Sequence, residues 1–183
     1  ILVALGVYVH SVFPTVAAGL ASVVIWTILV VINLFGINAM AKIQSLATPL
    51  LLFALVLFSV IGATKIPAGN LSFSNPDFMT NGAGGFATAV VLLVYSCYGQ
   101  SMVVNYSAQA KNPTRDVPKA MLIATLIIMV IYTAVGFTAS NVLPLAEIAG
   151  QPLTGTAKAI LPGALFVFFI VGGPIMALLT TCN

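Results

Sequence analysis

The fold is decided by residues 82–110, GAGGFATAVVLLVYSCYGQSMVVNYSAQA, a stretch of 29 residues without a single charged side chain. One straight helical crossing of a hydrocarbon core of ~30 Å needs only about 20 apolar residues, so this stretch is longer than a single crossing requires. Its aliphatic run is interrupted between residues 95 and 101, where hydroxyl, thiol and amide groups surround Gly99.

Glycine gives up helical hydrogen bonds more cheaply than other residues, and the lipid interior tolerates opened backbone only where protein or water satisfies it. We therefore predict a helix over 84–110 that is broken near residues 98–101. In transporters such broken helices hold substrates. The alternative is one long tilted helix in which Gly99 is a helix-packing contact.

The composition places the chain in a bilayer. Of 183 residues, 61% are hydrophobic and 5% are charged, and the mean hydropathy is +1.17. A soluble domain of this length cannot cover itself with so few charges, and a net charge of +3 is too small to suggest a nucleic-acid partner. We expect an all-α membrane protein, with residues 1–183 forming one incomplete transmembrane domain.

Apolar runs of the length of a membrane helix recur along the chain. Besides the broken segment 84–110, they predict a partial helix over 1–12 and helices over 16–35, 47–63, 121–141 and 163–181. A short turn is expected at residues 38–42, and the outer segment 145–162 is expected to hold a short helix at the membrane interface.

The basic residues predict the orientation, because cytoplasmic loops collect lysine and arginine. If the helices alternate in direction, Lys42, Lys111, Arg115 and Lys119 share one side of the membrane. We therefore expect a multi-pass protein of the cell membrane in which loops 36–44 and 111–119 are cytoplasmic.

Two motifs carry a resemblance to a known family. The segment KNPTRDVPKA at residues 111–120 resembles the loop between the sixth and seventh helices of amino acid permeases of the amino acid, polyamine and organocation (APC) family. The segment NLFGINAMAKIQ at residues 33–44 is similar to the short turn between helices four and five of that family. The resemblance extends from the end of helix three to most of helix eight.

The resemblance implies part of the inverted-repeat transporter fold with a broken sixth helix, and secondary active transport of amino acids by alternating access. The implied partners are an amino acid substrate, the lipid bilayer and the missing helices of the same transporter. A polyamine or amine permease is the alternative within the family. A structural membrane subunit without transport activity, or a channel, is the alternative from another class.

An unwound helix supplies freed N–H groups for a carboxylate and freed C=O groups for an ammonium, which suits a zwitterion in a site of low dielectric. By the resemblance, this segment of the sixth helix lines the substrate site, with Ser96, Cys97, Tyr98, Gly99, Gln100 and Ser101 as its candidate residues. None of these side chains is ionised, so we expect a neutral amino acid as the substrate.

The loop motif is expected to act as a structural turn or gate at the cytoplasmic mouth. Its candidate residues are Lys111, Asn112, Pro113, Arg115, Asp116 and Pro118. Asp116 stands between Arg115 and Lys119, and we expect its carboxylate to pair locally and to fix the turn.

The coupling ion is left open between sodium, a proton, and exchange or uniport without an ion. Thr180 and Thr181 resemble the adjacent hydroxyls that sodium-coupled relatives in the wider fold offer to the ion. Leu51 stands about where some proton-coupled members of the family place a lysine. Such threonines equally serve helix packing or bond their own backbone. We expect no cofactor or bound metal apart from such an ion.

An enzyme is not expected. Three carboxylates and one histidine, His10, are scattered over both predicted faces of the membrane, and they form no acid–base pair, metal cluster or nucleophile constellation. Cys97 and Cys182 both lie in apolar segments and are expected to be buried thiols.

Overall fold

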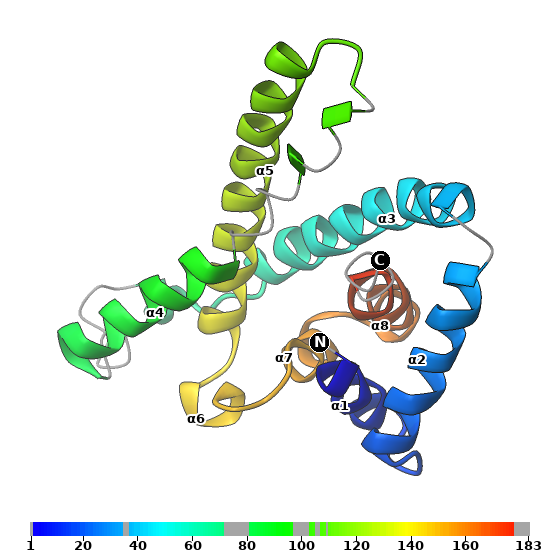
Figure 1. Ribbon diagram of the computed structural model, residues 1–183. Helices are drawn as coiled ribbons and strands as arrows, with labels where there is room; N and C mark the ends of the chain where they lie inside the picture. Colours follow the sequence, from blue (N-terminus) through cyan, green and yellow to red (C-terminus); the bar gives the residue numbers. More distant parts are fainter. Residues whose placement is uncertain are drawn as a thin grey trace. The chain divides into compact units, whose positions relative to one another are not determined.

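The computed structural model describes residues 2–34, 37–71, 81–96, 103–104, 107–108 and 110–177, and within these ranges it contains helices and loops but no strand. The helices, shown in Figure 1, are α1 (Leu2–Val12), α2 (Ala18–Leu34), α3 (Ile37–Ala63), α4 (Gly82–Ser96), α5 (Pro113–Val142), α6 (Leu145–Ile148), α7 (Leu153–Ile160) and α8 (Gly163–Ile170). A 3-10 helix, η1 (Ala68–Leu71), follows α3, and a π-helix, η4 (Val171–Ile175), follows α8.

The chain divides into two compact units. One unit consists of Ile1–Pro67 and Val135–Asn183, and the other of Ala68–Ala134. The first unit holds α1 to α3, the last turns of α5 and everything after them, whereas the second holds α4 and most of α5.

In the first unit, α1 and α2 pack closely through a glycine. Gly6 is buried, and a Cβ atom at this position would collide with the carbonyl oxygen of Ala18 and the Oγ atom of Ser22. The loop that follows α1 is held by His10, whose Nδ1–H donates to the carbonyl oxygen of Val16 over 2.9 Å. This bond gives the single histidine a structural partner at the end of the helix.

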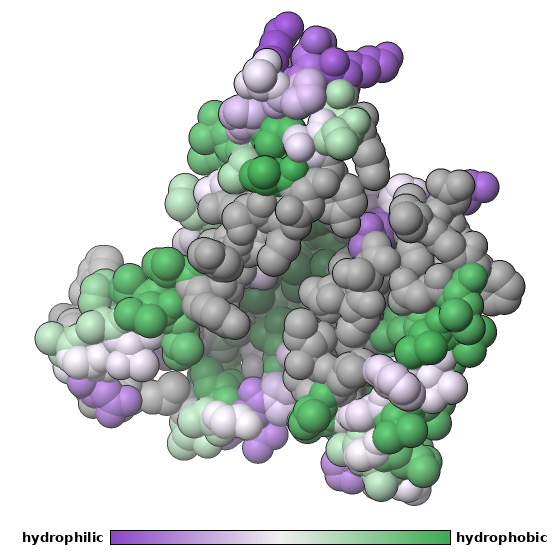
Figure 2. All heavy atoms as spheres, viewed as in Figure 1, coloured by the Kyte–Doolittle hydropathy of each residue, from purple (hydrophilic) through white to green (hydrophobic). Residues whose placement is uncertain are grey.

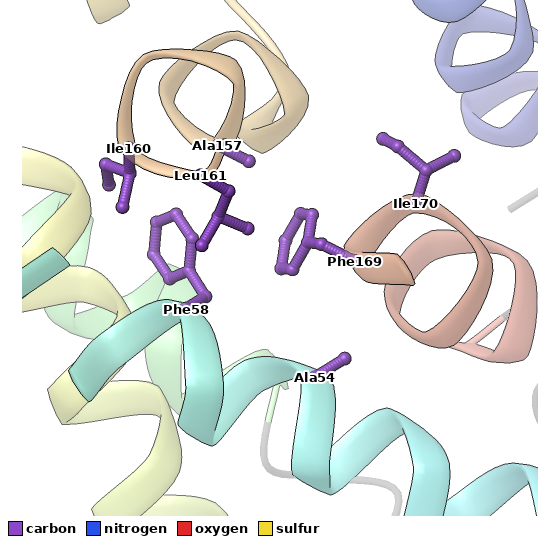
Figure 3. Packing of buried hydrophobic residues seen from close by; sticks show 7 residues of the cluster. All are labelled: Ala54, Phe58, Ala157, Ile160, Leu161, Phe169 and Ile170. Carbon is purple, nitrogen blue, oxygen red and sulfur yellow. The ribbon is translucent and has the colours of Figure 1, made fainter. Parts of the chain in front are cut away.

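The core of this unit lies between α3, α7 and α8 (Figure 3). Phe58 of α3 and Phe169 of α8 are almost completely buried, and their ring centroids lie 5.3 Å apart. Ile160 of α7 is also fully buried in this cluster. The expected short helix within residues 145–162 includes α7, and α7 packs against α3 and α8, while its place at the membrane interface stays a prediction. The reason for this packing is the pattern of α7, which buries Thr154, Ala157 and Ile160 on one face and leaves Lys158 exposed.

The last turns of α5 join this core at a very close crossing with α3. Thr138 is buried, and its hydroxyl donates to the backbone carbonyl oxygen of Ser59 over 3.4 Å. A Cβ atom at Gly62 would collide with Cγ2 of Thr138 and would lie 3.1 Å from Cδ1 of Ile160. Position 62 thus has no room for a side chain, because α5 and α7 both approach α3 closely at this point.

The π-helix η4 packs against α3. Gly172 is buried, and a Cβ atom there would lie 3.2 Å from Cβ of Ala54 and 3.4 Å from the carbonyl oxygen of Leu50. Pro174 lies inside η4 and cannot donate a backbone hydrogen bond, which favours a locally altered helical ladder. The expected helix over 163–181 is therefore α-helical only to Ile170 before it widens, and residues 178–183 lie outside the described part of the chain.

Two helices begin earlier than the apolar runs predicted. Helix α3 starts at Ile37 and passes through Pro49, so residues 38–42 are helical and do not form the expected turn. Helix α5 starts at Pro113, eight residues before the predicted start at residue 121. In both helices a more polar segment precedes the apolar one. A prediction from hydrophobicity finds only the apolar segment and therefore places the start of the helix too late.

Within the described residues, two helical segments are long and apolar enough to cross a membrane, namely Gln44–Ala63 of α3 and Pro113–Val142, which is α5. Shorter apolar helices are Ala18–Val31, Gly82–Val94 and Gly163–Ile175.

Candidate functional site

The predicted substrate segment, Ser96 to Ser101, lies almost entirely outside the described residues. Ser96 is the last residue of α4, and nothing beyond its backbone is described. Cys97, Tyr98, Gly99, Gln100 and Ser101 lie outside the described residues, as do the two candidate ion ligands Thr180 and Thr181. Their roles stay predictions.

Helix α4 leads into this segment and exposes apolar side chains. It starts at Gly82, whose φ of +57° suits glycine, and its 15 residues correspond to about 22 Å at 1.5 Å per residue. Residues 90–94 are all exposed apolar side chains, as expected of a surface that lipid or further helices cover.

The chain beyond this point was predicted to continue as helix to residue 110. Five residues of that segment are described: residues 103–104 and 107–108 have 3-10 conformation, residue 110 lies in a bend, and none of the five is α-helical. The backbone N–H of Ala110 donates to the carbonyl oxygen of Ser107 over 3.2 Å, a bond that closes a tight turn of this kind. The predicted α-helical bounds are corrected accordingly for these residues.

The candidate gate residues form the beginning of α5. Pro113 is the first residue of the helix, where its missing N–H costs nothing. Asn112 precedes it and accepts hydrogen bonds through its carbonyl oxygen from the backbone N–H groups of Arg115, over 3.1 Å, and Asp116, over 2.8 Å. Lys111 comes one residue earlier and Pro118 lies within the helix, so the motif is a helix start and not a free turn.

Asp116 pairs locally, but with backbone and not with a basic side chain. Its Oδ2 atom accepts a hydrogen bond from the backbone N–H of Asn112 over 3.2 Å. This bond satisfies one of the N–H groups that every helix start leaves free. In the described part of the chain Asp116 forms no ion pair with Arg115 or Lys119, which corrects the expectation of charge pairing.

Two further observations bear on ion coupling and on metal binding. Leu51, which stands about where the resemblance expects a coupling lysine, lies half-buried in α3. Among the described residues no group of three histidine, cysteine, aspartate or glutamate side chains could hold a metal ion.

Sequence reasoning missed one polar contact that ties the helices together, the bond from Thr138 to Ser59. Gly62, three residues after Ser59, was the feature of the sequence that indicated a close contact at this place, because a glycine in an apolar helix permits another helix to approach closely. Ser59 could not be paired with Thr138 from sequence, since the two residues lie 79 positions apart.

These features define a helical membrane protein whose apolar helices make close contacts at glycine residues. A sequence model described as amino acid permease matches residues 1–182. The chain therefore belongs to the amino acid permease family, as the two motifs predicted.

Three relatives illustrate the range of the family. The chain is 30% identical to the uncharacterized protein MJ0609 of Methanocaldococcus jannaschii, over 77% of this chain and 32% of the relative. It is 26% identical to the branched-chain amino acid permease BcaP of Bacillus subtilis, over 63% of this chain and 24% of the relative. It is 22% identical to the cadaverine/lysine antiporter of Escherichia coli, over 84% of this chain and 36% of the relative.

The chain thus spans about a third or less of the length of these curated relatives. No solved structure matches it significantly.

Proposed function

We propose that the protein containing this chain is a secondary active transporter that moves amino acids across the cell membrane by alternating access. The observation that carries the proposal is the family match over residues 1–182. The names of the relatives support it, because one is a permease of branched-chain amino acids and another an antiporter of cadaverine and lysine.

A backbone break near Gly99 would supply both kinds of partner that a zwitterionic substrate needs. The last carbonyl groups of a helix lack partners within the helix, so they are available to accept hydrogen bonds from a substrate ammonium. N–H groups at the start of a following helical segment would receive the carboxylate. Ser96 to Ser101 is the segment that we assign to this role, with Gly99 as the point at which the backbone opens.

A neutral amino acid is the proposed substrate. No charged side chain lies in residues 82–110, and a second charge on the substrate would need a partner there. The second candidate, a cationic amine such as those named for the cadaverine/lysine antiporter, requires an acidic partner from a helix outside this chain.

Coupling to sodium through Thr180 and Thr181 is the proposed ion mechanism, with coupling to protons or exchange as the alternatives. Hydroxyl and carbonyl oxygens suit a hard cation such as sodium. Leu51 offers no group that takes up a proton, so proton coupling would have to use other residues. In the proposed topology, loops 36–44 and 111–119 face the cytoplasm.

The test is uptake of radiolabelled leucine into proteoliposomes that contain the complete protein, in competition with each of the twenty amino acids. Protein-free liposomes are the control. We expect neutral aliphatic amino acids to compete most strongly. Dominant competition by lysine or arginine would overturn the neutral preference, and the absence of uptake for all twenty would overturn amino acid transport.

A further inference from the structure

The beginning of α5 carries an exposed basic patch, which we define as Lys111, Arg115 and Lys119. Within nine residues it holds three of the six basic side chains of the chain, and all three are exposed. Figure 2 shows hydrophilic residues gathered at this end of α5 and hydrophobic residues on the part of the helix next to it. The patch is thus a concentrated positive charge at the edge of an apolar surface.

The one carboxylate in this segment does not neutralise the patch. Asp116 directs Oδ2 to the backbone N–H of Asn112, 3.2 Å away, and forms no ion pair within the described residues. Residues 111–119 therefore keep a net positive charge, because they carry three basic side chains and one carboxylate, and that carboxylate already accepts a hydrogen bond from the backbone. Arg115 and Lys119 are four residues apart in a helix, which places their side chains on the same face.

The length of α5 places the patch at the depth of lipid headgroups. The helix has 30 residues, about 45 Å at 1.5 Å per residue, and residues 120–142 carry no charge over about 34 Å. This uncharged part alone matches a hydrocarbon core of ~30 Å. When it spans that core, the turns that carry Arg115 and Lys119 lie in the headgroup layer, beside the phosphates of the lipids.

From this placement we propose that the basic patch binds the phosphate group of an anionic phospholipid in the leaflet that this end of α5 meets. Arginine binds a phosphate through two parallel N–H groups, and lysine adds a point charge from the next turn of the same face. A phospholipid fits better than a soluble anion because its acyl chains would lie along the uncharged face of residues 120–142. The inference rests on insertion in a membrane and does not require transport.

The test measures binding of fluorescent phosphatidylglycerol and of fluorescent phosphatidylcholine to the complete protein in detergent. Arg115→Gln combined with Lys119→Gln removes two charges from the patch. Lys65→Gln combined with Lys158→Gln is the matched control, because it removes two exposed charges elsewhere. Helical circular dichroism and gel-filtration volume check that both variants fold.

We expect the unmodified protein to prefer phosphatidylglycerol, and the patch variant to lose about 25-fold in affinity for it, roughly fivefold for each cation. The control should keep its affinity, and added salt should weaken binding. If the double variant does not fold, Arg115→Gln alone should lose about fivefold.

Three results would overturn the proposal. These are equal affinity of the unmodified protein for the two lipids, unchanged phosphatidylglycerol binding by the patch variant, and displacement of the lipid by an equal concentration of inorganic phosphate. The last would identify a site for a soluble anion. Each readout is a binding constant, so the result is independent of whether the protein transports amino acids.

Discussion

Replacing Gly62 by alanine is expected to destabilise the protein through a collision at the crossing of α3 and α5. The added Cβ atom would strike Cγ2 of Thr138 and would lie 3.1 Å from Cδ1 of Ile160. Both neighbours are buried, with exposed fractions of 1% and 0%. Thr138 is β-branched and stiff about χ1, so its methyl group cannot turn away cheaply.

The magnitude follows from the sum of two opposing effects. Forcing an extra carbon into a packed core costs about 1–3 kcal/mol. Exchanging glycine for alanine inside a helix recovers about 0.5–1 kcal/mol of this. We therefore expect Gly62→Ala to lower the free energy of unfolding by about 1 kcal/mol, within a range that reaches about 2.5 kcal/mol.

A second substitution should relieve the collision. Thr138→Ser removes the Cγ2 methyl group that the new Cβ atom would meet, and it keeps the hydroxyl that donates to Ser59. Alone it should cost about 1 kcal/mol for the lost methyl group. Combined with Gly62→Ala it should cost less than the sum of the two single changes, with a coupling free energy of about 1–2 kcal/mol.

The assay is unfolding of the complete protein in mixed micelles with increasing sodium dodecyl sulfate, followed by circular dichroism. Gly136→Ala is the matched control, because Gly136 lies in α5, is exposed, and has no atom within 4 Å of an added Cβ atom. This control should be as stable as the unmodified protein or slightly more so. Equal stability of Gly62→Ala and Gly136→Ala, or strictly additive losses in the double variant, would refute the packing argument.

Three further predictions test other parts of the molecule. Phe58→Ala should lower the free energy of unfolding by about 3–5 kcal/mol in the same assay, because it empties a fully buried position beside the ring on α8; a loss below about 1 kcal/mol would contradict this burial. Asp116→Ala should cost about 0.5–2 kcal/mol through loss of the bond to the N–H of Asn112, whereas Asp116→Asn, which keeps a side-chain acceptor, should cost less; equal losses would argue against the cap. Thr180→Ala with Thr181→Ala should weaken sodium stimulation of uptake more than apparent substrate affinity at saturating sodium, and uptake by the unmodified protein that is unchanged when choline replaces sodium would reject sodium coupling.

Sequence could predict the apolar helices because a bilayer imposes a simple requirement of length and hydrophobicity. The predicted helix starts were too late where a helix begins in a polar segment, as α3 and α5 do. The start of α5 at Pro113 carried a recognisable signal, since Asn112 is a preferred helix cap and proline is favoured at the first helical position. Reading that signal ahead of hydrophobicity would have placed the helix start correctly.

Packing of the short outer helix α7 could not be decided by composition alone. Glu147, Gln151, Pro152 and Lys158 marked an outer segment, but they did not indicate that Thr154, Thr156 and Ile160 are buried against other elements. Burial of a threonine depends on which helix lies against it and whether a partner oxygen is near. Those partners are fixed by tertiary contacts between segments far apart in the chain.

The substrate segment was identified by its polar interruption and by family resemblance, and not by geometry. The structure describes α4 over Gly82–Ser96, and residues 97–101 of the interruption lie outside the described part of the chain. The arrangement of Tyr98, Gly99 and Gln100 stays a prediction.

The most direct test of the proposed transport site is amino acid uptake by the complete protein carrying Gly99→Leu, compared with Gly136→Leu as a control for a bulky residue in an apolar helix. Both variants are reconstituted in equal amounts into liposomes, and uptake of the preferred amino acid is measured. An opened backbone at Gly99 that holds the substrate cannot accept a leucine side chain. We predict that Gly99→Leu abolishes uptake while the protein stays folded and membrane-inserted, and that Gly136→Leu retains it; normal uptake by Gly99→Leu would contradict the account.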